Sequence, residues 1–264
     1  RFLRPRPDLY HAIGRGKCFS KHPKGWHGDI RRLERVLVVS RGVTKYPAFT
    51  FLPNKFIFSE KLYVIADERY SLFSILSSDI HSVWAWSQKT SLGGDLYSLS
   101  YTHGNIFETF PFPLEVLSNG DEELEKLGKE FFERRQAFME SQNKGLTKFY
   151  NDFHSSSVVG SEIKDLRIMQ TSINRAVCTK YGWDVEVACG FHEVGYLPKG
   201  KNIRFSISEA ARLEVVRHLS KLNKVRFDEQ SLSDPATKFS KARKASIEND
   251  PFEDGLFATG SGRT

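Results

Sequence analysis

The apolar residues change their spacing along this sequence, and that change limits the fold more than any other feature. Between residues 36 and 65 they form short runs of β-branched and aromatic residues, which are typical of strands. After residue 70 they recur every three or four residues, which is typical of amphipathic helices. The sequence therefore predicts an α+β chain with the strands first. The predicted strands are residues 36–39, 48–51, 56–58 and 62–65.

Turn and cap residues refine this prediction. Pro53 and Asn54 favour a turn, so residues 48–51 and 56–58 are expected to form a hairpin within an antiparallel meander. Helices are predicted over 70–86, over 121–142 with a continuation after Gly145, and over 161–181. A further helix is expected to begin at 206–209, where Ser206 and Glu209 have the spacing of a capping box. On the helix over 121–142, Glu130, Arg134 and Arg135 are expected to face water.

Composition divides the chain into three parts. We expect a β-rich domain over 1–115, a helical region over 116–230 and a flexible tail over 231–264, where the apolar period ends and Ser, Lys, Asp and Gly dominate. The chain begins with Arg instead of Met, which suggests a piece of a longer protein. No run of apolar residues approaches the length of a membrane helix, and the three cysteines are far apart. Both observations favour a cytoplasmic protein with no membrane partner.

Positive charge is concentrated near the start of the chain. The 264 residues carry a formal net charge of +7, whereas residues 1–50 alone hold twelve Lys and Arg and three Asp and Glu. The remainder is therefore close to neutral. A local excess of this kind is typical of a surface that binds a polyanion such as DNA.

Motifs for common enzyme chemistry are poorly matched. The segment 14–17, Gly-Arg-Gly-Lys, lacks the strand and the Lys-Ser or Lys-Thr helix start of a phosphate-binding loop. Cys178, Cys189 and His192 provide three potential zinc ligands without a second close pair, so half-buried thiols are the better interpretation.

A metal-dependent nuclease is also disfavoured. Asp152, Glu162 and Lys164 fit the loose acid, Glu-x-Lys pattern, but they lie in a helical context instead of a buried strand. No Ser, His and Asp set can be recognised as a triad, because triads are defined in space. We predict no catalytic residue, no metal site and no cofactor for this chain.

The remaining functional signal is basic residues mixed with amides. Phosphate contacts require only positive charge at suitable spacing, whereas base reading requires bidentate donors or amides in loops. The predicted DNA-backbone contacts are Arg31, Arg32, Arg35, Lys45, Lys55 and Lys61. The predicted base contacts are Arg41, Asn54, Gln88 and Lys89.

Several ordered strings resemble a known family. They include Ser77–Ala85 with its Ser-Ser, His and Trp-Ala, then Ser91-Leu92 with Asp95-Leu96, then Phe-Glu-Thr-Phe-Pro-Phe-Pro at 107–113. Further matches follow at 176–184, 190–192 and 204–226. Together they resemble the C-terminal part of bacterial adenine-N6 DNA methyltransferases. These relatives comprise type IIG and type IIL restriction-modification enzymes and the methyltransferases of BREX and DISARM phage-defence systems.

The resemblance implies a target recognition domain that selects a sequence in double-stranded DNA. An upstream methyltransferase domain would bind S-adenosylmethionine and flip the adenine, because the chain has no Asn-Pro-Pro-Tyr motif and no Gly-rich S-adenosylmethionine loop. In this sequence Tyr97–Ser100 lies between Asp95-Leu96 and Tyr101-Thr102, where relatives are shorter. The alternative function is a protein-interaction module that docks a partner subunit of a defence complex.

Some of the family's residues have structural interpretations as well. The alternation Phe110-Pro111-Phe112-Pro113 is expected to pin the sheet to the helical region. We expect Trp84 and Trp86 to be packed, with stacking on a base as the alternative for Trp86. His81 is expected to be a hydrogen-bond partner instead of an acid or base.

Overall fold

The computed structural model describes residues 33–89 and 97–233, and these form a mixed α+β fold, as expected. The predicted contacts Arg31 and Arg32, the segment 14–17, the string from 90 to 96 and most of the predicted tail lie outside the described residues. Contacts divide the chain into two units at Leu219, and nearly all described elements belong to the first. No described helix is long and apolar enough to cross a membrane.

The strands are short. Their bounds are β1 Arg35–Ser40, β2 Val43–Thr44, β3 Thr50–Pro53, β4 Leu62–Ile65, β5 Leu99–Ser100, β6 Cys189–Glu193 and β7 Ile203–Ile207. Helices take up most of the remainder. Their bounds are α2 Tyr70–Ser77, α3 Asp79–Ser87, the π-helical turn η3 His103–Phe107, α4 Leu114–Asn119, α5 Glu122–Ser141, α6 Leu146–Phe153, α7 Ser161–Tyr181 and α8 Glu209–Ser233.

Strand β1 lies in the middle of the main sheet, whose order is β3-β1-β4, with both pairings antiparallel. Its four central residues, Val36 to Val39, are all buried, which explains why the most apolar run occupies the central position. The predicted hairpin between 48–51 and 56–58 is therefore wrong. The chain does turn after Pro53, but β3 pairs with β1, and residues 56–58 form no strand.

The predicted helix over 70–86 is two helices. Ser78 has extended backbone angles, φ −71° and ψ 158°, and its hydroxyl accepts a hydrogen bond from the backbone N–H of His81 at 3.3 Å. Ser78 thus caps α3 and ends α2. The helices α5, α6 and α7 confirm the predictions for 121–142, the continuation after Gly145 and 161–181.

The N-cap residue of α8 is two residues later than predicted. Ser206 belongs to β7, which pairs antiparallel with β6, and Ser208 caps the helix by accepting from the backbone N–H of Ala211 at 3.2 Å. Glu209 forms an ion pair with Arg212 at 3.0 Å instead of closing a capping box.

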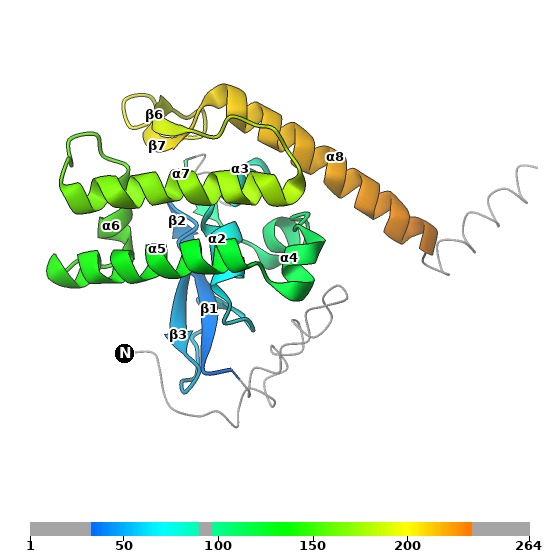
Figure 1. Ribbon diagram of the computed structural model, residues 1–264, viewed down its shortest axis with the longest axis horizontal. Helices are drawn as coiled ribbons and strands as arrows, with labels where there is room; N and C mark the ends of the chain where they lie inside the picture. Colours follow the sequence, from blue (N-terminus) through cyan, green and yellow to red (C-terminus); the bar gives the residue numbers. More distant parts are fainter. Residues whose placement is uncertain (1–32, 90–96, 234–264) are drawn as a thin grey trace, which may run out of the picture. The chain divides into compact units, whose positions relative to one another are not determined.

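One hydrophobic cluster runs through the strands and through α2 to α7. The ring of Phe51 in β3 packs on Phe132 in α5 with centroids 5.3 Å apart, so the cluster is continuous across residue 115. Helices α2 and α5 approach closely, because a Cβ at Gly128 would collide with Ser74 and the carbonyl of Tyr70. Helices α5 and α7 run side by side, with β6 next to α7 (Figure 1). The domain boundary at 115 stays a prediction.

Arg135 corrects the prediction for the wet side of α5. Its side chain is fully buried, and its guanidinium donates to the carbonyl of Phe49 at 2.9 Å and to the hydroxyl of Tyr150 at 3.1 Å. Glu130 and Arg134 do form the expected surface pair at 2.9 Å. The arginine joins α5 to α6 and to the chain just before β3.

Candidate nucleic-acid interface

The described members of the predicted contact set lie at both ends of β1 and near a cavity, instead of on one surface. At the far end of the strand, the backbone N–H of Arg41 donates to the carbonyl of Lys61 at 2.8 Å, so the two residues are neighbours. Both are exposed, and the Arg41 guanidinium lies 5.7 Å from the centre of the Tyr63 ring. One predicted base contact and one predicted phosphate contact therefore share this end.

The near end of β1 holds three other members of the set. The backbone N–H of Asn54 donates to the carbonyl of Glu34 at 2.9 Å, and its side-chain amide donates to Leu33 at 3.0 Å. Lys55 is exposed beside Phe56, at 5.5 Å. Strands rise about 3.3 Å per residue, so this end lies roughly 17–20 Å from Arg41.

Arg35, at the same end, already has partners inside the fold. Its guanidinium donates to the Tyr70 hydroxyl at 2.6 Å and to the Glu68 carbonyl at 2.7 Å. It also lies over the rings of Phe51 and Tyr70, at 4.2 and 4.0 Å. A phosphate contact by Arg35 stays a prediction that would have to compete with these interactions.

Three predicted contact residues lie near a cavity. Lys45 lines it directly, Gln88 is the C-cap residue of α3, and the Lys89 ammonium lies 5.1 Å from the ring centre of the cavity-lining Trp86. The cavity has a volume of about 50 Å³. The residues lining it are Lys45, Tyr46, Pro47, Leu76, Ser77, Ser78, Asp79, Ser82, Trp86, Tyr150, Phe153, His154, Gln170, Tyr196, Arg204 and Ser206.

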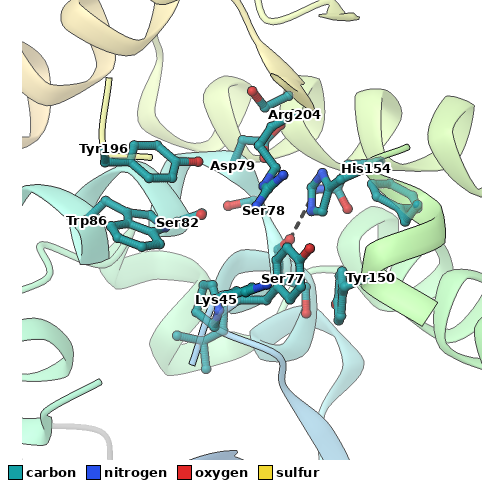
Figure 2. Close-up of a pocket in the computed structure, with 16 residues that line it drawn as sticks. Lys45, Ser77, Ser78, Asp79, Ser82, Trp86, Tyr150, His154, Tyr196 and Arg204 are labelled. Carbon is teal, nitrogen blue, oxygen red and sulfur yellow. Dashed lines mark hydrogen bonds between the residues drawn. The ribbon is translucent and has the colours of Figure 1, made fainter. Parts of the chain in front are cut away.

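Aromatic rings form two opposite walls of the cavity. Figure 2 shows Trp86 and Tyr196 on one side, Tyr150 and His154 on the other, and Arg204 reaching in from the β6–β7 hairpin. Trp86 and Tyr196 are stacked at 4.1 Å, and Tyr46 stacks on His154 at 5.1 Å. In both walls, a ring stacks on another from a different segment of the chain.

Cations lie against these rings. The guanidinium of Arg204 is 5.4 Å from the Tyr46 ring centre, and that of Arg212 is 4.7 Å from Tyr196. Together with Lys89 over Trp86, they place positive charge around both aromatic walls.

Burial controls the protonation of the polar groups around the cavity. Burial and, to a smaller extent, the charge of Arg204 lower the pKa of His154 to about 3, so the imidazole is neutral at pH 7. Burial also raises the pKa of Asp79, although its carboxylate accepts from Asn174 at 2.8 Å and from the Cys189 thiol at 3.4 Å. Asp79 is the one carboxylate among the lining residues of the cavity.

The sequence prediction did not include Arg204, Tyr46 or Tyr196 among the contact residues. Arg204 lies in a string that resembles the family, but nothing in that string marks it as a neighbour of Lys45, because β7 reaches the cavity only in the folded chain. For Tyr46 and Tyr196, the sequence provides no indication of a contact role beyond the fact that both residues are aromatic.

The disfavoured motifs do not assemble into sites. Among the described residues, no group of three or more His, Cys, Asp or Glu could hold a metal ion. Asp152 forms an ion pair with Lys144 at 2.7 Å, while Glu162 and Lys164 are exposed in the first turn of α7.

The sequence strings that resemble the family are mainly structural in this fold. His81 is buried, its Nε2 lies 2.9 Å from the Tyr101 hydroxyl, and burial lowers its pKa to about 3. Trp84 and Trp86 are buried, as predicted. Phe110 packs edge-on against His81 at 4.6 Å and against Phe112 at 4.7 Å, so this Phe-Pro segment is a core contact of α3.

Comparison with known families gives one match that covers a third of the chain. Residues 27–114 match the family model of the MmeI target recognition domain. The predicted resemblance to a target recognition region is confirmed over this segment. It contains the sheet β3-β1-β4 and helices α2 and α3.

A solved structure of the type IIL restriction-modification enzyme MmeI in complex with DNA is similar to this chain at 15% sequence identity and a TM-score of 0.42. The similarity covers 77% of this chain and 22% of that one, so the chain spans less than a quarter of that protein. A search of curated proteins finds no match.

Proposed function

We propose that this chain recognises a specific sequence in double-stranded DNA. The observation that carries the proposal is the match of residues 27–114 to the MmeI target recognition domain. A domain of that type implies contacts to base edges for sequence selection and contacts to phosphates for position.

The exposed charges fit this function. Arg41 and Lys61 adjoin at one end of β1, and Lys45, Lys89 and Arg204 lie around the cavity. In the proposed complex, Arg41, Gln88 and Lys89 contact bases, while Lys45 and Lys61 contact phosphates. Asn54 and Lys55 would contact DNA only if the duplex extended to the opposite end of β1.

The parent activity belongs to the same proposal. We infer that this chain is the specificity part of an adenine-N6 DNA methyltransferase of a restriction-modification or phage-defence system. S-adenosylmethionine and the flipped adenine would be bound by an upstream methyltransferase domain. The part of the chain that the structure describes supplies no metal cluster for cleavage.

The test is selection from a pool of randomised duplexes by the 264-residue chain at two salt concentrations, followed by sequencing of the bound fraction. An enriched motif and an affinity that falls with salt are expected, because phosphate contacts release counterions. Fluorescence anisotropy gives the affinity. Salt-sensitive binding without enrichment would place the specificity with the missing domain, and no binding at either salt would overturn the proposal.

A second candidate is a protein-interaction module that docks a defence subunit. The observation behind it is two exposed apolar side chains, Ile168 on α7 and Leu213 on α8, which are 64% and 65% exposed. Replacing both with Gln distinguishes the two functions. The change should leave DNA affinity unaltered if DNA is the partner, and it should abolish subunit binding if a protein is.

A further inference from the structure

Two basic side chains that are distant in the sequence meet at the cavity. Lys45 follows β2, and Arg204 lies in β7, more than 150 residues later. Both line the cavity, and both remain partly or fully open to solvent. Because it is so small, the cavity has room for one or two waters and cannot enclose a base. A ligand of these two cations therefore sits at the mouth.

Neither cation is neutralised by the fold. Within residues 33–89 and 97–233, Lys45 forms no hydrogen bond or ion pair, and Arg204 donates only to the carbonyls of Lys201 and Ile203, at 3.5 and 3.0 Å. Asp79 is turned toward Asn174 and Cys189. Some exposed cations in the helices do pair with nearby carboxylates, as Lys129 does with Glu133 and Arg134 with Glu130.

A neutral donor lies beside the two cations. The hydroxyl of Ser77 and Nδ1 of His154 are buried beside the cavity and have no hydrogen-bond partner within the described residues. The hydroxyl can donate to an oxyanion, whereas Nδ1 of a neutral imidazole donates in only one of its two tautomers. Helix α3 begins at Asp79, which lines the cavity, but the N–H groups of Asp79 and His81 already donate to Asn174 and Ser78.

We propose that Lys45 and Arg204 together bind one phosphodiester of the DNA backbone. This inference rests on the proposed DNA recognition and extends it. The β6–β7 hairpin lies outside the matched segment 27–114, so a phosphate held by Arg204 makes the region after residue 115 part of the DNA-binding surface. Its role is positioning, because phosphate contacts carry no sequence information.

The test is the salt dependence of duplex binding by the 264-residue chain and its variants Lys45→Gln and Arg204→Gln. Each lost phosphate contact should reduce the slope of log Kobs against log salt by about 0.9, which weakens binding about eightfold at 0.1 M salt relative to 1 M. All duplex sequences should weaken by the same factor. Arg204→Lys should retain the slope, since it keeps the charge.

The matched control is Lys126→Gln on α5, an exposed lysine outside the cavity lining, which should change neither slope nor affinity. Thermal unfolding of each variant checks that the fold is intact. If both cavity variants bound DNA with the wild-type slope, the phosphate site would be wrong while DNA recognition stood.

If the wild-type chain bound no duplex, DNA recognition itself would fail. Calorimetric titration with inorganic phosphate then tests the site separately. Binding that is lost in Arg204→Gln would assign the site to a free phosphate and overturn its DNA role, and absence of binding would overturn the site altogether.

Discussion

The two ends of strand β1 carry arginines in opposite surroundings. The guanidinium of Arg35 lies against the rings of Phe51 and Tyr70 and donates to a hydroxyl and a carbonyl. Arg41 is exposed, with one ring 5.7 Å away. Both belong to the basic segment that indicates a polyanion partner. The comparison teaches that an equal charge in the sequence can be held inside the fold at one end of a strand and stay exposed to solvent at the other.

Arg135 extends the comparison to the interior. It is fully buried among the rings of Phe73, Phe131 and Phe132, and its hydrogen bonds go to a carbonyl and a hydroxyl instead of to a carboxylate. Aromatic faces and neutral oxygens can hold a guanidinium because it is planar and weakly hydrated. A count of charged residues in the sequence therefore does not show which arginines are buried.

The largest expected effect is on stability, from Arg35→Ala. Losing two charge-assisted hydrogen bonds and two cation–π contacts should lower the free energy of unfolding by about 2–4 kcal/mol. Urea denaturation measures it. The matched change Arg41→Ala should alter stability by no more than about 0.5 kcal/mol. Equal effects of the two variants would remove the distinction between the ends.

Arg41→Ala should instead change sequence preference. If its guanidinium reads a base pair, the variant should lose about 1–3 kcal/mol of discrimination at one position of the selected site. Competition between the selected duplex and single-base variants, measured by anisotropy, gives this value. An unchanged preference among sequences would show that Arg41 reads no base.

The titration of His81 tests how burial in the interior affects an ionisable side chain. Its pKa is lowered to about 3 in the folded chain, whereas an unfolded histidine titrates near 6.5. Above pH 6.5 both states are neutral and the group has no effect. As the pH falls below 6.5, only the unfolded state gains the proton, so stability should drop, by roughly 2 kcal/mol at pH 5.

Urea unfolding at pH 7.5 and pH 5 measures that drop. His81→Gln keeps a side chain able to bond the Tyr101 hydroxyl but cannot titrate, so its loss between the two pH values should be smaller by roughly the same 2 kcal/mol. A wild-type loss that His81→Gln leaves unchanged would assign the pH dependence to other groups, such as His154.

The helices could be predicted where the sequence carries local signals. Asp121 caps α5 by accepting from the N–H of Leu124, and apolar residues recur along one side of α5 and α7. The sheet could not be predicted, because β3 pairs with β1, a separate strand that ends at Ser40, and the turn at Pro53 is compatible with either partner. Hydrophobic runs predict that strands exist, not which strands pair.

The site was predictable only in part for the same reason. Charge and loop position predicted Lys45 and Lys89 as DNA contacts, which stays a prediction. Of the two, Lys45 lines the cavity, which also takes side chains from α6, from the loop at Tyr196 and from β7. Sequence distance hides the approach of Arg204 to Lys45. Arg35 was predicted as a phosphate contact because the sequence shows its charge but does not show the aromatic rings that surround it.

The smallest expected effect compares two exposed lysines at the opposite ends of β1. Lys61 is a neighbour of Arg41, and Lys55 follows β3 at the Arg35 end. If DNA lies at the Arg41 end, Lys61→Ala should reduce the slope of log Kobs against log salt by about 0.9, while Lys55→Ala should leave it unchanged. Anisotropy titrations from 0.05 to about 0.3 M salt give both slopes.

The two lysines are a well-matched pair, because both are exposed and lie next to the same sheet. Equal reductions would mean that the duplex spans both ends of the strand. Asn54 would then lie on the DNA-binding surface. The two ends of β1 would differ only in how much their arginines stabilise the fold.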